Sequence, residues 1–212
     1  MKKFFMITPL QPIGRLNEGL YEAIGNEKLA YGKKTRFPLI PVINGYAQKD
    51  EEIRVITITP NTVPANVHLQ EFKEELEALK AEKGFICNEV DNIPVTYAGD
   101  VNTQIEIFQK LLPYMENNDR LYGCLTYGNK PMPIAELMGI QYAYRALQNV
   151  SIECLVYGEL DHSLEPAPMR IFDITALVQL DELVRVLAEK KVKDPVKIVN
   201  MVLGMGGDED GE

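Results

Sequence analysis

The sequence contains no tryptophan and only three cysteines among its 212 residues. Cys87, Cys124 and Cys154 are odd in number and widely spaced, which excludes a disulfide framework and a Cys-x-x-Cys metal site. Each cysteine stands in an apolar segment that is typical of a strand. We therefore expect all three to be buried core residues.

Histidine is also scarce, with His68 in the first turn of a predicted helix and His162 after a predicted strand. Neither has a nucleophile or a second ligand at a telling spacing, so we interpret both as surface or capping residues. The spacing of Asp161, His162 and Glu165 matches no metal motif. The sequence therefore predicts no metal and no cofactor.

Long apolar runs and clusters of basic residues are missing too. No run approaches the roughly 20 residues needed to span a bilayer, and the stretch after Met1-Lys2-Lys3 is too short for a signal peptide. The net charge of -9 argues against general DNA or RNA binding, which requires clustered Lys and Arg. Four of these negative charges come from acidic residues at the C-terminus, so the folded part of the chain is only mildly acidic. This charge is compatible with a local cationic pocket in the folded part. We expect a cytoplasmic protein without a membrane partner.

A glycine-rich phosphate loop is absent from the place where a nicotinamide- or flavin-dependent enzyme would carry it. The first predicted strand is followed by Thr8-Pro9-Leu10-Gln11-Pro12 in place of Gly-x-Gly-x-x-Gly. The glycines from Gly204 onward follow a short helix and read as a linker. An oxidoreductase is therefore the least favoured function.

What the sequence does contain is an alternation of strands and helices. Short apolar or β-branched runs predict buried strands at residues 4–7, 53–58, 85–90, 121–125 and 152–157. Helical patterns lie between and after them, at residues 66–83, 103–115, 134–147 and 174–190. The alternation predicts an α/β fold with a Rossmann-like, mostly parallel sheet and helices on both faces. A late edge hairpin around Pro166 to Phe172 and a short C-terminal helix complete the predicted fold.

The predicted organisation is one ligand-binding domain over residues 1–193, a short helix over 194–204, and a flexible acidic tail or linker over 205–212. Residues 8–48 mix turn and short-helix signals, and we expect part of this segment to line a site or cross a dimer interface. Pro94 predicts a strand that ends near Val90 or a hairpin at Asp91-Asn92.

Ligands of parallel α/β sheets bind outside the carboxyl ends of the strands. The loops that follow four of the predicted strands are rich in hydroxyl, amide and glycine residues, which suit a ribose, a base or a phosphate. Within the loop after the fourth strand, Gly128 permits close backbone approach, Lys130 offers a charge, and a helix begins near Pro133. The candidate ligand-binding residues are Thr8, Pro9, Gln11, Arg15, Thr59, Asn61, Thr96, Tyr97, Asn102, Thr126, Tyr127, Gly128, Asn129, Lys130, Pro131 and Met132.

The segment from Leu121 to Pro133 is followed by a helix and then by Leu155-Val156-Tyr157-Gly158 and Ile171-Phe172-Asp173-Ile174-Thr175. This order resembles the CRISPR-associated Rossmann fold (CARF) proteins. The strand-four loop of that family is typically a Thr-His-Gly or Thr-Gly-Gly turn with a basic residue, similar to Thr126-Tyr127-Gly128-Asn129-Lys130. Tyr127 stands at the histidine position, which argues against a catalytic role there and leaves the binding roles of its neighbours.

The resemblance implies a homodimer whose two strand-four loops meet across a two-fold axis and hold a cyclic tetra- or hexa-adenylate. It also implies a sensor in type III CRISPR antiviral defence, whose effector lies beyond the C-terminus or on a partner chain. Adenine rings would stack against Tyr97, Tyr127 or apolar loop residues. We expect the other tyrosines considered, Tyr31, Tyr46, Tyr142 and Tyr144, in the core or at an interface.

The alternative function is a stand-alone, metal-independent ring nuclease. Such an enzyme orients a ribose 2′-hydroxyl in line with the next phosphate. Thr126 and Lys130 are then the candidate catalytic residues, through positioning and charge stabilisation.

Overall fold

A computed structural model of the chain describes residues 1–97, 100–164 and 167–204. The chain divides into two compact units, Met1–Thr175 and Ala176–Glu212. The boundary therefore falls well before residue 193, where the sequence analysis ended the ligand-binding domain. The predicted tail, 205–212, lies outside the described residues.

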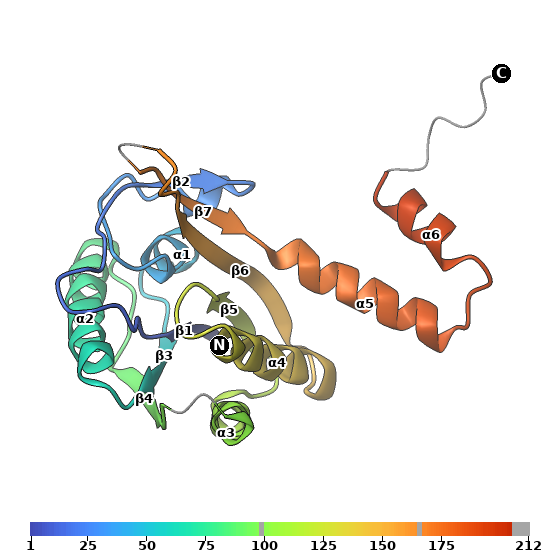
Figure 1. The fold of residues 1–212 in the computed structure, drawn as a ribbon, viewed down its shortest axis with the longest axis horizontal. Helices are drawn as coiled ribbons and strands as arrows, with labels where there is room; N and C mark the ends of the chain where they lie inside the picture. The colour runs from blue at the N-terminus through green and yellow to red at the C-terminus, as the bar shows by residue number, and fades with distance from the viewer. Residues whose placement is uncertain (98–99, 165–166, 205–212) are drawn as a thin grey trace. The chain divides into compact units, whose positions relative to one another are not determined.

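The first unit is built on one sheet, which has seven strands among the described residues, in the order β2-β7-β6-β5-β1-β3-β4 (Figure 1). Neighbouring strands run parallel except β6 and β7, which form an antiparallel pair. The strands are β1 (Lys2–Ile7), β2 (Tyr21–Ile24), β3 (Ile53–Pro60), β4 (Val90–Val95), β5 (Arg120–Cys124), β6 (Ser151–Leu160) and β7 (Met169–Asp173). The predicted α/β, Rossmann-like fold with a mostly parallel sheet is confirmed.

Helices cover both faces of this sheet. On one face α1 (Leu39–Tyr46) packs beside α2 (Val63–Lys83), and on the other α3 (Val101–Leu111) packs beside α4 (Pro131–Ala146). Successive residues of β5 point to opposite faces of the sheet, which shows which helices cover each face. Tyr122 lies in the core cluster under α1, whereas a Cβ on Gly123 would meet Ile140 of α4. Two short 3-10 helices, η1 (Glu27–Leu29) and η2 (Leu112–Tyr114), complete the unit.

The main core lies between the sheet and the α1–α2 layer. Phe4 of β1 stacks on Tyr122 of β5 with ring centroids 4.4 Å apart, and Tyr46 of α1 packs against the same ring. The three cysteines are buried and unpaired, as expected. Cys87, however, lies before β4 and outside any strand.

One strand prediction was wrong in position. The third predicted strand, 85–90, is in fact β4 at Val90–Val95, and only an isolated bridge joins Ile86 to Glu52. Pro94 is tolerated inside β4 because this strand is at the edge of the sheet.

Residues 8–48 contain more regular structure than their turn signals indicated. They form β2, η1 and α1, and β2 pairs with β7. The predicted late hairpin is present as β6 and β7, but β2 and not β7 forms that edge of the sheet.

The second unit contains α5 (Thr175–Glu189), which begins at the unit boundary, and α6 (Pro195–Val202). Asp194 caps α6 by accepting a hydrogen bond from the backbone N–H of Lys197 at 3.1 Å. The predicted short C-terminal helix is therefore present. The buried side chains of α5 are Val178 and Leu187, which is few for a helix of this length.

Candidate ligand-binding site

The strand order places a topological switch point between β1 and β5. From β1 the chain first forms β2 at the far edge of the sheet, then returns to add β3 and β4 on one side of β1, and finally adds β5 and β6 on the other. The His68–Gln11 contact holds the loop after β1 against α2 on one face of the sheet, whereas the loop after β5 leads into α4 on the other face. Ligands of open α/β sheets bind in the crevice between such loops.

The loop after β5 folds back over the end of β1 at Gly128. Gly128 has a φ of +97°, and a Cβ there would stand 3.1 Å from both Ile7 Cγ2 and Met132 Cβ. Glycine is required here because the backbone passes over Ile7 in a left-handed conformation. The structure thus packs the loop after β5 onto Ile7, the last residue of β1.

Lys130 lies beside this turn, exposed, at the N-terminal end of α4. Pro131 and Pro133 supply no N–H groups, and the N–H of Met132 is bonded to the carbonyl of Asn129 at 2.9 Å. The start of α4 therefore offers an anion few backbone donors. The Lys130 ammonium is the main positive charge that this loop can present to a phosphate.

Two oxygen atoms near this edge of the sheet are buried and have no hydrogen-bond partner among the described residues: Asn129 Oδ1 and Thr59 Oγ1. Asn129 belongs to the loop after β5, and Thr59 lies in β3, next to β1. Buried polar atoms are normally paired, so an unpaired acceptor at a candidate site indicates a place for a ligand donor or an ordered water.

Thr126 has a structural role. Its Oγ1 accepts a hydrogen bond from the Gly158 N–H at 2.8 Å and lies 3.3 Å from Cys124 Sγ. These contacts tie the loop after β5 to β6. The hydroxyl oxygen of Thr126 is thus already engaged inside the protein.

Tyr127 does not have the position expected for a residue that stacks on adenine. Its side chain is 6% exposed, its ring meets Phe37 edge-on, and its hydroxyl donates to the carbonyl of Arg36. Burial raises the pKa of Tyr127 well above its ordinary value. The ring is a core residue, so in this arrangement it is not exposed for the expected stacking on adenine.

The remaining predicted residues divide by burial. Thr8, Pro9 and Met132 are buried, and the N–H of Thr8 donates to the Ile58 carbonyl at 3.0 Å, which ties β1 to β3. Their side chains cannot reach a ligand in this arrangement, so the binding roles expected of them are not supported. Pro131 is half-buried. Exposed positions are occupied by Gln11, Arg15, Asn61, Thr96, Tyr97 and Asn102.

Tyr97 stays free to stack on a base, with 51% of its side chain exposed. Thr96 and Tyr97 follow β4, which is two strands from β1. At about 4.8 Å per strand, they stand about 10 Å along the sheet from the Gly128 turn. They can contact only a ligand that extends across β3.

His68 is fully buried in α2, and the surface or capping position expected for it is wrong. Its Nδ1 lies 2.7 Å from Glu71 Oε2 and its Nε2 lies 2.9 Å from the Gln11 carbonyl. The side chain therefore fastens the loop after β1 onto α2. It positions one wall of the candidate site and is neither a surface residue nor a cap.

The sequence analysis also missed Glu136, a fully buried residue in the second turn of α4. Neither carboxyl oxygen has a partner among the described residues, and Oε1 would lie 3.6 Å from a Cβ on Gly123. Burial raises the pKa of Glu136 well above its ordinary value, which favours the neutral carboxyl. Its position among the buried residues of α4, Met132, Ala135, Gly139, Ile140 and Ala143, is a helical periodicity that could have revealed it.

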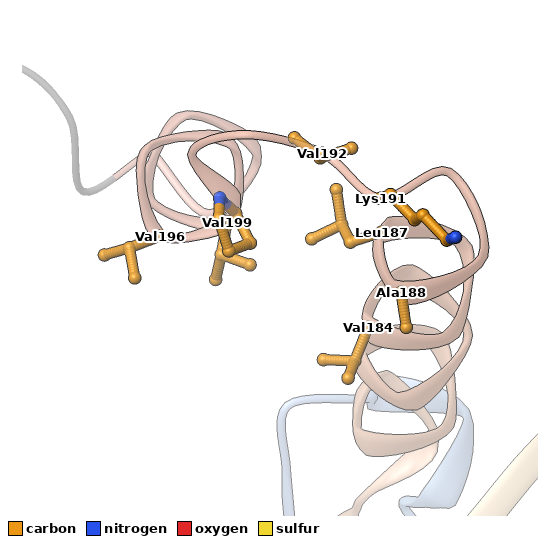
Figure 2. A pocket seen from close by; sticks show the side chains of 8 residues that line it. Val184, Leu187, Ala188, Lys191, Val192, Val196 and Val199 are labelled. Carbon is orange, nitrogen blue, oxygen red and sulfur yellow. The ribbon is translucent and has the colours of Figure 1, made fainter.

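The second unit has an apolar groove of its own, with a volume of about 440 Å³. Figure 2 shows side chains of α5, such as Val184 and Leu187, facing Val196 and Val199 of α6. Apart from Lys191 its lining side chains are apolar. Such a groove can accept an apolar side chain but offers little to hold a polyanion.

The fold defines the chain as a Rossmann-like α/β protein, and the candidate site lies at the switch point of its sheet. No protein-family model matches the chain, and no curated protein matches it significantly. Within the described residues, no helix is long and apolar enough to cross a membrane. No three His, Cys, Asp or Glu side chains of the described part of the chain gather as metal ligands.

Proposed function

We propose that this chain is a CARF-type sensor domain that binds a cyclic tetra- or hexa-adenylate as a homodimer. In this proposal it acts in the cytoplasm and regulates an effector, in cis or in trans, in type III CRISPR antiviral defence. One observation carries the proposal: the Gly128 turn passes over Ile7 at the switch point with the exposed Lys130 beside it. The Lys130 ammonium supplies the positive charge that a phosphodiester needs.

The residues around this turn suit the other parts of a nucleotide. The unpaired Asn129 Oδ1 can accept a hydrogen bond from an adenine amino group or a ribose 2′-hydroxyl. Tyr97 presents an exposed ring on which a base can stack. Gln11, Arg15 and Asn61 are exposed on the neighbouring loops.

A single copy of this loop holds a modest set of contacts for a ring with several phosphates. A cyclic oligoadenylate with two-fold symmetry would meet the loop of each subunit once if it lay on a dimer axis. The lysine and amide contacts are then doubled. Dimerisation is how a chain with a net charge of -9 can hold a polyanion.

The contacts of Thr126 favour binding over the alternative of ring cleavage. Its oxygen already accepts the Gly158 N–H, so the residue is poorly placed to orient a ribose hydroxyl. Lys130 remains as the other candidate for charge stabilisation. Incubation of the protein with cyclic tetra- and hexa-adenylate for hours, followed by chromatography, is expected to leave both rings intact.

The proposal is tested by calorimetric titration of each ring into wild type, Lys130→Ala and the control Lys83→Ala. Lys83 is a lysine in the last turn of α2, at the opposite edge of the sheet. We expect Lys130→Ala to weaken binding about 100-fold, because two charge-assisted hydrogen bonds of at least about 1.4 kcal/mol each are lost from a dimer. Lys83→Ala should bind like wild type. Equal affinity of Lys130→Ala and wild type would place the site elsewhere.

A further inference from the structure

Helix α6 carries apolar side chains that stay largely uncovered. Valine, isoleucine and methionine occupy five of its eight positions, and none of the eight side chains is buried. Val196, Met201 and Val202 are 66%, 65% and 62% exposed. A helix that is apolar around most of its surface is normally buried, and a helix of this length is not stable alone in water. Helix α6 therefore has the composition of a helix that another surface covers.

The groove between α5 and α6 gives this apolar surface a concave shape. Leu187 of α5 and Val196 and Val199 of α6 line it from opposite sides (Figure 2), and its volume is about 440 Å³. A hydrophobic groove accepts the apolar face of an amphipathic helix, whose side chains enter it at positions three or four residues apart. A bilayer is suited to apolar side chains that point outward together, and these side chains face one another instead.

The surroundings of the groove are basic, although the chain has a net charge of -9. Four exposed lysines lie within eight residues and form no ion pair with a described residue: Lys190, Lys191, Lys193 and Lys197. The acidic residues nearby are engaged, because Asp194 caps α6 and Glu189 pairs with Arg185. The lysines therefore favour acidic side chains on whatever enters the groove.

We propose that the α5–α6 groove binds an amphipathic helix of a partner protein, with apolar side chains one turn apart and Asp or Glu beside them. The apolar side chains enter between Leu187 and Val196, and the acidic ones meet the lysines. Two such grooves would bring like charges together, so a second copy fits this surface less well. A nucleic acid would meet the lysines with its phosphates but leave the apolar groove uncovered.

This surface lies outside the candidate ring site, and the inference does not rest on the proposed function. It is tested with the full chain and two fluorescent peptides of about 16 residues, which is long enough for a helix. One peptide has leucine at every third or fourth position with glutamates between them, and the other has lysine in place of each glutamate. We expect the acidic peptide alone to raise the anisotropy, and more weakly at high salt. Binding of neither peptide, or equal binding of both, would overturn the proposal.

Two matched pairs of variants locate the peptide. Val196→Glu should weaken binding of the acidic peptide at least about 10-fold, because a carboxylate would be buried without a partner. Val202→Glu, on the same helix and similarly exposed but outside the groove, should bind like wild type. Lys191→Glu, which changes a residue that lines the groove, should weaken binding about 3-fold, whereas Lys34→Glu in the first unit should not. Equal affinities within both pairs, with unchanged circular dichroism spectra, would place the peptide elsewhere.

The other occupants are distinguished in the same experiments. Vesicles of phosphatidylserine and phosphatidylcholine, or a DNA duplex, should displace the acidic peptide less effectively than the unlabelled peptide does. The reverse result would overturn a helix as the occupant. Val196→Glu should leave the mass measured by light scattering unchanged, and a halved mass would assign the groove to a second copy. Because no cyclic oligoadenylate is present in any of these measurements, their failure would leave the proposed function untouched.

Discussion

Gly128 is the residue on which the shape of the candidate site depends most directly. Its positive φ turns the chain after β5 back over Ile7, and any side chain would push against Ile7 and Met132 at 3.1 Å. Backbone strain and lack of space thus coincide at one position. Gly25 shares the positive φ, at +80°, but a Cβ there would meet nothing within 4 Å.

The pair Gly128→Ala and Gly25→Ala therefore separates strain from packing. We expect Gly128→Ala to lower the free energy of unfolding by about 1–3 kcal/mol and to weaken ring binding, because the turn must move away from β1. Gly25→Ala should cost about 1 kcal/mol and leave ring binding unchanged. Urea unfolding and calorimetry measure the two effects. Equal behaviour of the two variants would show that the Gly128 turn is not tightly packed.

Glu136 places an ionisable carboxyl in the interior beneath α4, where it has no hydrogen-bond partner among the described residues. Its carboxyl is buried and unpaired in the folded chain, and burial raises its pKa. The neighbouring thiol of Cys124 has a pKa raised to about 12 by burial, so it is not a nucleophile at neutral pH. Burial thus favours the neutral form of both groups.

The raised pKa of Glu136 predicts a stability that falls as pH rises. Above the unfolded pKa of about 4.3 the folded chain keeps a proton that the unfolded chain has released, so unfolding becomes easier by up to about 1.4 kcal/mol per pH unit. This loss continues until the folded pKa is passed. Glu136→Gln should remove this contribution, so the gap in unfolding free energy between variant and wild type should widen as pH rises above about 5. A constant gap in urea titrations would mean that Glu136 is ionised in the folded chain.

At the scale of elements, the helices and most central strands could be predicted because their patterns are local. Leu69, Phe72, Leu76 and Leu79 predict the buried face of α2, and all four are buried. The position of β4 could not be predicted from Pro94. Proline is excluded from central strands but accepted in edge strands. Only the strand order shows that β4 is an edge strand. For β2 the signal is weak, since its residues are only partly buried.

The N-terminus of α2 shows how a local signal fixes an element next to the site. Thr62 Oγ1 accepts a hydrogen bond from the Ala65 N–H at 3.3 Å, and α2 carries His68, which holds the loop after β1. Thr62→Ala should lower the free energy of unfolding by about 1 kcal/mol, whereas Thr62→Ser should keep most of it. Equal losses in the two variants, measured by chemical unfolding, would show that the hydroxyl does not cap the helix.

At the scale of the whole molecule, the sequence located the edge of the sheet where the candidate site lies but not the roles of its residues. Lys130 and Gly128 were predictable from their place between a strand and a helix. Tyr127 and His68 were not, because their burial depends on contacts with Arg36 and Gln11, which are distant along the chain. Long-range packing decides which side chains of a loop face the ligand.

The central claim is that two copies of the chain hold one ring between them. Native mass spectrometry of the full chain with cyclic tetra- or hexa-adenylate tests it most directly, because it counts chains and rings in the same complex. We predict a complex of two chains with one ring, which is absent for Lys130→Ala. A complex of one chain with one ring, or no complex with either ring, would contradict the account.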